Sequence, residues 1–99
     1  MAEVKTIALV LRGPAWRDEL TLLEQVEISG HLGLMARLSR EGVIEAAGPF
    51  AMPDERLEGD ALGLVIFADA DLETAQRALE DDPARGTGTV AYKVLPWYR

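Results

Sequence analysis

Residues 62–68, LGLVIFA, constrain the fold more than any other segment, because every residue in this strand-length run is apolar or glycine. Such a run is typical of a strand whose two faces are both covered. The chain has 99 residues, which is enough for one domain with a modest core and too few for two. The sequence therefore predicts a single domain over residues 1–99, in which this run is a strand covered on both faces.

Three further segments have the composition and spacing of strands. They are residues 4–11, 43–51 and 89–95. In the first of them Ile7, Leu9 and Leu11 share one face, while the opposite face is small and mostly apolar. Residues 52–61 are rich in turn formers and predict a polar loop before the apolar run.

Two segments have apolar residues at helical spacing. The first begins at Leu20 and carries His31 on its apolar stripe. We expect a helix that is capped by Asp18 and ended by Gly42, with its weakest point near Gly30.

The second helical segment lies between the apolar run and the last strand. Asp69 and Asp71 both offer N-caps for it. Its predicted buried stripe comprises Leu72, Ala75 and Leu79. We expect Pro83 to end this helix, because the residue before a proline disfavours helical geometry, and we expect residues 84–88 to form a loop.

The order of these segments, β-α-β-β-α-β, predicts an α+β fold of the ferredoxin-like sandwich type. In this fold a four-stranded antiparallel sheet carries two helices on one face. The strands at 4–11 and 62–68 are nevertheless apolar on both sides, so the second face also needs a cover. We expect a homodimer whose open sheet faces pack together; the alternative is a long loop that folds back over the face.

Composition and charge exclude several classes of function. The formal net charge of −7 disfavours a nucleic-acid partner, because a phosphate-binding surface needs an excess of basic residues. The chain has no cysteine for thiolate metal sites or disulfides, and its one histidine, His31, cannot supply a two-histidine metal site. No secretory signal pattern or membrane-length apolar stretch is present. We therefore expect a cytoplasmic protein that makes no membrane contact and uses no metal or cofactor.

His31 is the first candidate for chemistry, because an imidazole can act as general acid or base near neutral pH. The alternative is a half-buried, inert ring at a helix flank. Asp81 and Asp82 are candidate orienting groups, since a carboxylate beside an imidazole holds its tautomer. The alternative for Asp82 is a turn hydrogen bond to nearby backbone. Spacing alone leaves both alternatives open.

Four residues near the ends of the first two strands are candidates for substrate binding. Arg12 and Trp16 follow the first strand, and an arginine beside an aromatic ring suits an anionic aromatic ligand. Trp16 is equally well explained as a cover on the sheet edge. Gly48 and Pro49 close the second strand, where glycine permits close approach of the backbone to a ligand; the alternative is a turn that ends the strand.

Four motifs in register resemble the YCII-related family of small bacterial proteins. They are LRGPAW at 11–16, His31-Leu32 leading through Gly42 to AGPF at 47–50, Asp82-Pro83, and Pro96-Trp97-Tyr98. The resemblance runs over nearly the whole chain. It implies a dimeric α+β barrel with a ferredoxin-like subunit and an active site built on a His-Asp pair, here His31 and Asp82.

The resemblance also implies small-molecule enzymes, one branch of which eliminates chloride from a chlorinated hydroxyquinol. This chain departs from the family pattern at two positions. Ala84 stands where a large apolar residue is common, which predicts a wider pocket. Ile28 stands where another branch carries an arginine, so an anion clamp from that position is missing.

Two function classes follow. In the first, His31 oriented by Asp82 moves a proton on a small cyclic or aromatic substrate, in an elimination, isomerisation or lyase reaction without a metal. In the second, the chain is a non-catalytic dimeric module that binds a small molecule or a protein, and the motif residues are architectural. An open cleft at His31 favours the first class, and a closed, dry environment favours the second.

Overall fold

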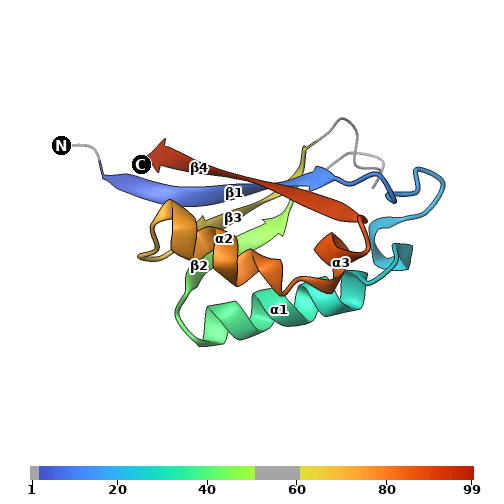
Figure 1. Cartoon of the computed structure of the whole chain (residues 1–99), viewed down its shortest axis with the longest axis horizontal. Helices are drawn as coiled ribbons and strands as arrows, with labels where there is room; N and C mark the ends of the chain where they lie inside the picture. Colours follow the sequence, from blue (N-terminus) through green and yellow to red (C-terminus); the bar gives the residue numbers. More distant parts are fainter. Residues whose placement is uncertain (1–2, 51–60) are drawn as a thin grey trace.

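The computed structural model describes residues 3–50 and 61–99 (Figure 1). Its elements in chain order are β1 (Val4–Arg12), the 3-10 helix η1 (Leu22–Glu24), α1 (Ile28–Arg40), β2 (Ile44–Pro49), β3 (Ala61–Phe67), α2 (Leu72–Glu80), α3 (Pro83–Gly86) and β4 (Val90–Tyr98). The predicted polar loop at 52–61 lies, except for its last residue, outside the described residues. Among the described residues, no helix is long and apolar enough to cross a bilayer.

The four strands form one sheet in the order β2-β3-β1-β4, and all three neighbouring pairs are antiparallel. The long helices α1 and α2 lie on the same side of this sheet (Figure 1). This arrangement confirms the predicted α+β, ferredoxin-like sandwich. The apolar run forms β3, which the structure places between β2 and β1.

The hydrophobic core lies between the sheet and the helices. Ala8 of β1 and Val65 of β3 are cross-strand partners, and both are buried against core residues of α1 and α2. Because successive side chains in a strand point to opposite faces, Leu9 and its partner Leu64 lie on the face without helices. The next such pair on this open face is Ile7 with Ile66, so the middle of the face is apolar, whereas Lys5 of β1 and Lys93 of β4, the partner of Leu9, lie on the same face.

The first helix begins later than the sequence predicts. Residues 18–27 are irregular apart from η1, and α1 begins at Ile28. Gln25 explains the delay: its buried side-chain amide donates to the Arg17 carbonyl at 2.7 Å and accepts from the Arg17 amide at 3.1 Å. The same side-chain amide also donates to the Leu20 carbonyl at 3.2 Å, and this satisfies a backbone acceptor that a helix beginning at Leu20 would otherwise pair. The predicted cap Asp18 instead forms an ion pair with Arg12.

Two predictions at the C-terminal end also need correction. Pro83 follows the end of α2 as expected, but it then occupies the first turn of α3, a short helix where a loop was expected. Proline suits this position because its missing N–H has no helical partner there. The last strand continues through Pro96 to Tyr98, and β4 tolerates this proline because it lies at the sheet edge.

Candidate active site

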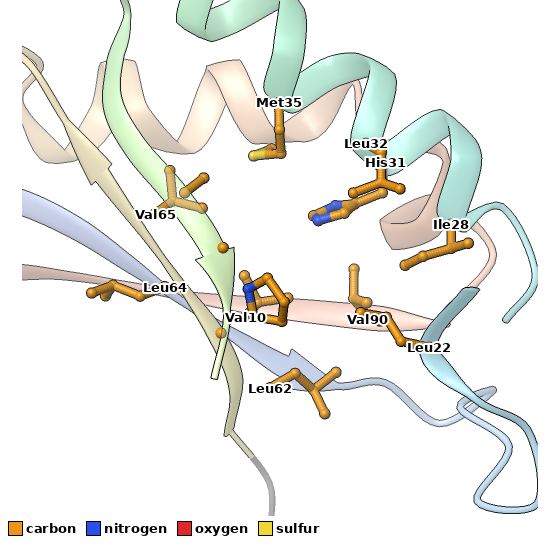
Figure 2. Close-up of a pocket in the computed structure, with 14 residues that line it drawn as sticks. Val10, Leu22, Ile28, His31, Leu32, Met35, Leu62, Leu64, Val65 and Val90 are labelled. Atoms are coloured by element: carbon orange, nitrogen blue, oxygen red, sulfur yellow. The ribbon is translucent and has the colours of Figure 1, made fainter. Parts of the chain in front are cut away.

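A cavity of about 140 Å³ lies between α1 and the sheet, and His31 lies in its wall. Figure 2 shows the imidazole projecting from α1 toward the middle of this cavity, between Met35 and Val90. The other described lining residues are apolar or glycine: Val10, Leu22, Ile28, Leu32, Met35, Ala47, Gly48, Pro49, Leu62, Gly63, Leu64, Val65 and Val90. His31 is thus the only ionisable side chain among the described lining residues.

The structure places His31 and Asp82 within hydrogen-bonding distance. Nδ1 of His31 lies 2.6 Å from Oδ2 of Asp82, and the aspartate is 1% exposed. The other carboxylate oxygen, Oδ1, accepts from the Ala84 amide at 2.9 Å and caps α3. Both readings of Asp82 therefore hold at once, because one oxygen binds local backbone and the other binds the imidazole.

A close contact between α1 and α3 brings these two side chains together. A Cβ atom on Gly30 would lie only 2.7 Å from Cγ of Pro83, so the helices approach this closely only because residue 30 is glycine. His31 directly follows the glycine and Asp82 directly precedes the proline. The contact thus sets the distance between imidazole and carboxylate.

Tyr92 of β4 is a third polar group at this site. Its hydroxyl donates a hydrogen bond to Oδ2 of Asp82 and lies 3.1 Å from Nδ1 of His31. The sequence contains a usable signal for it: Tyr92 alternates with Val90 and Val94 on the core-facing side of β4, and a buried tyrosine hydroxyl needs a partner. Its actual partners could not be identified from spacing.

The Asp82 carboxyl is held in its ionised form. Burial acts to raise its pKa, but hydrogen bonds from His31 and Tyr92, the attraction of the His31 charge and the Ala84 amide together hold the pKa below its ordinary value. Burial and the hydrogen bond to Asp82 raise the pKa of Tyr92, so its hydroxyl stays protonated and remains a donor. The site therefore holds one fixed negative charge beneath the imidazole.

This electrostatic arrangement assigns roles to the two ring nitrogens of His31. An ionised carboxylate only accepts hydrogen bonds, so Nδ1 carries the proton that points to Asp82. In the neutral ring, Nε2 then carries the lone pair. Since His31 lines the cavity and its Nδ1 is committed to Asp82, Nε2 is the nitrogen available to a bound molecule. Chemically, the site can accept a proton at Nε2 and return it.

The candidate substrate-binding residues separate into two groups. Gly48 and Pro49 line the cavity. Their neighbour Gly63 was missed; a Cβ atom there would lie 2.6 Å from the Gly48 carbonyl oxygen, so a glycine is needed for β2 to pack this closely. Arg12 and Trp16 do not line the cavity and instead contact each other, with the guanidinium carbon 5.4 Å from the centre of the indole ring.

The two departures from the family pattern have different locations. Ile28 lines the cavity, so an apolar wall stands at the position of the missing arginine. Ala84 is fully buried in the core and is absent from the cavity wall. Among the described residues, no three histidine or acidic side chains are arranged to hold a metal ion.

The sequence profile of the YCII-related domain matches residues 17–98. The chain belongs to the YCII-related family. No curated protein matches the chain. The YCII-related match includes both members of the His31–Asp82 pair, Tyr92, and the cavity-lining segments from η1 to β4.

Proposed function

We propose that this YCII-related protein is a small-molecule enzyme in which His31, oriented by Asp82, acts as general acid and base. The observation that carries the proposal is the 2.6 Å contact between His31 Nδ1 and the buried Asp82 carboxylate, made at the wall of a cavity. An imidazole held by a carboxylate is the usual arrangement of a general base. An open cavity at His31 favours this proposal over a non-catalytic binding module.

The proposed reaction begins when Nε2 of His31 accepts a proton from the substrate. His31 takes a proton from a carbon or hydroxyl group of the substrate and becomes an imidazolium, which the Asp82 carboxylate stabilises through Nδ1. In an elimination, the electron pair of the broken bond forms a double bond and a leaving group departs with its own pair. In an isomerisation, His31 returns the proton to a different atom of the substrate.

The cavity supports a small, ring-sized substrate with an uncharged buried part. Its volume of about 140 Å³ is close to the roughly 150 Å³ of apolar cavities that bind benzene. No cationic side chain other than a protonated His31 is present among the described lining residues to hold a buried carboxylate or phosphate. Gly48 and Pro49 supply backbone surface against which a flat ring can lie.

Base-catalysed ring opening of 1,2-benzisoxazole tests this function without knowledge of the natural substrate. A base removes the C3 proton, the N–O bond breaks, and 2-cyanophenol is released and followed by its absorbance. We expect the wild-type protein to accelerate this step and His31→Gln to lose about 10²–10⁴-fold, because glutamine fills similar space without a basic nitrogen. Equal rates for wild type and His31→Gln would contradict the proposal.

We also propose that two copies of the chain pack through their open sheet faces. The support is the apolar character of this face, on which Leu9 and Leu64 are cross-strand partners at the centre of the sheet. Isologous packing of identical faces is the simplest way to cover such a surface. The loop alternative would have to use residues 51–60, which lie outside the described part of the chain.

Sedimentation equilibrium tests the proposed dimer. We expect the wild-type protein to have twice the 10.8 kDa mass of the chain, and Leu9→Glu to be monomeric because it places a charge at the centre of the interface. Leu72→Glu is the matched control, since Leu72 is 42% exposed at the start of α2, on the helical side, and the prediction that it is buried was wrong. A monomeric wild type, or a Leu9→Glu variant that remains dimeric, would contradict a dimer packed through the open sheet faces.

A further inference from the structure

We propose that Tyr92 is a positioning residue that fixes the His31–Asp82 pair in its working form. The inference rests on the proposed function and extends it to a side chain outside the cavity lining. Tyr92 donates to Oδ2 of Asp82, the same oxygen that binds Nδ1 of His31. Its own oxygen lies 3.1 Å from that Nδ1. The three groups therefore form a closed triangle of polar contacts.

The triangle acts on the imidazole in two ways. The tyrosine hydroxyl has one proton and two lone pairs, and its proton is used for Asp82. A lone pair of the hydroxyl oxygen is then left to face Nδ1, so this nitrogen has two acceptors nearby, Asp82 Oδ2 and the Tyr92 oxygen. Both acceptors favour the tautomer with the proton on Nδ1 and the lone pair on Nε2. In this way Tyr92 supports the nitrogen that meets the substrate without touching the substrate itself.

The three groups of the triangle come from separate parts of the fold. Asp82 lies between α2 and α3, His31 projects from α1, and Tyr92 projects from β4, where it is the cross-strand partner of Val10. The imidazole and phenol rings are nearly parallel, with an interplanar angle of 27° and centroids 6.5 Å apart. A buried carboxylate that accepts from His31 and Tyr92 at Oδ2 and from the Ala84 amide at Oδ1 has little freedom to rotate. Tyr92 thus fixes the orientation of the Asp82 carboxylate by a hydrogen bond from β4, and α1 places His31 beside the same carboxylate.

The charged and titratable groups around Tyr92 are consistent with a permanent donor. Asp82 raises the pKa of the tyrosine after the larger effect of burial, whereas Arg85 of α3 acts in the opposite direction. The hydroxyl therefore keeps its proton whenever Asp82 is ionised. Reciprocally, the hydrogen bond from Tyr92 lowers the pKa of Asp82, second to that from His31 among the hydrogen bonds that do so.

NMR of the wild type and of Tyr92→Phe tests the role directly, since phenylalanine keeps the ring and removes only the hydroxyl. With one histidine in the chain, the two ring ¹⁵N signals belong to His31 without ambiguity. We expect Tyr92→Phe to increase the share of the Nε2–H tautomer and to move the Asp82 carboxyl ¹³C titration to higher pH. Tyr98→Phe, in the same strand but 74% exposed, should change neither signal. Wild-type signals in Tyr92→Phe would overturn the inference.

A second measurement covers the case in which Tyr92→Phe does not fold. The chain has two tyrosines, so a Tyr98→Phe protein grown with 3-fluorotyrosine carries fluorine only at Tyr92. We expect its ¹⁹F signal to shift when Asp82→Asn is introduced, and an unchanged signal would overturn the inference. These spectra are recorded without substrate, so they test Tyr92 separately from the benzisoxazole rates, which test the proposed function.

Discussion

Replacing Asp82 with asparagine is expected to lower the free energy of unfolding by about 2–3 kcal/mol at pH 7, because hydrogen bonds to a buried charged group are strong. The aspartate accepts from His31, Tyr92 and the Ala84 amide. An asparagine keeps one acceptor oxygen and turns an NH₂ group toward at least one of these donors. Asp81→Asn is the matched control, since Asp81 is the exposed neighbour and its nearest cation, Arg37, lies 3.6 Å away. We expect little change from the control.

The decrease in the free energy of unfolding caused by Asp82→Asn should become smaller as the pH falls. The folded-state pKa of Asp82 is held below its unfolded value of about 3.9. The carboxylate therefore contributes stability that is fully present above that value and is lost as pH falls through the folded-state pKa. Urea unfolding of wild type and Asp82→Asn should differ most at neutral pH and converge in acid. A difference that stays constant from pH 7 into acid would contradict an ionised Asp82 in the folded protein.

Alanine substitutions at two glycines of α1 are expected to change stability in opposite directions. Gly33→Ala should raise the free energy of unfolding by about 1 kcal/mol, because a Cβ there meets nothing within 4 Å and alanine favours the helix. Gly30→Ala should lower it by about 1–3 kcal/mol, because the new Cβ would lie 2.7 Å from Cγ of Pro83 and the rigid ring must move.

The same pair of variants tests how the site is assembled. Movement of Pro83 away from α1 carries Asp82 with it, so Gly30→Ala should also weaken the contact with His31 and reduce proton transfer to benzisoxazole. Gly33→Ala lies one turn further along the helix and should leave that rate unchanged. Equal stabilisation by both substitutions, with equal rates, would show that the α1–α3 contact does not position the pair.

The alternation of segments was enough to predict the sheet and its topology. The uninterrupted apolar run at 62–68 indicated a strand covered on both faces, and short right-handed connections left few other arrangements. The start of α1 could not be predicted from apolar spacing. Leu20 and Leu23 continue the helical spacing of the apolar stripe on α1, although they lie before the helix. In the structure Leu23 is 73% exposed, and the buried amide of Gln25 donates to the Leu20 carbonyl, which a longer helix would have paired.

The site was predictable only in part, because its members are far apart in the sequence. His31 and Asp82 are 51 residues apart, and spacing alone left both as candidates with inert alternatives. Their meeting depends on the Gly30–Pro83 contact, which is a property of the folded chain. Tyr92 was missed for the same reason, since its hydroxyl partners lie on two other elements. Arg12 and Trp16, which do contact each other, are only four residues apart in the sequence, at the end of β1 and in the loop after it.

The ring nitrogens of His31 report directly on whether Asp82 sets this imidazole to act as a base toward the cavity. We would record their ¹⁵N signals in wild type and Asp82→Asn, at a pH where the ring is neutral. We expect a proton on Nδ1 and a lone pair on Nε2 in the wild type, with a shift toward the opposite tautomer in Asp82→Asn. A wild-type ring protonated on Nε2, or the same tautomer mixture in both proteins, would contradict it.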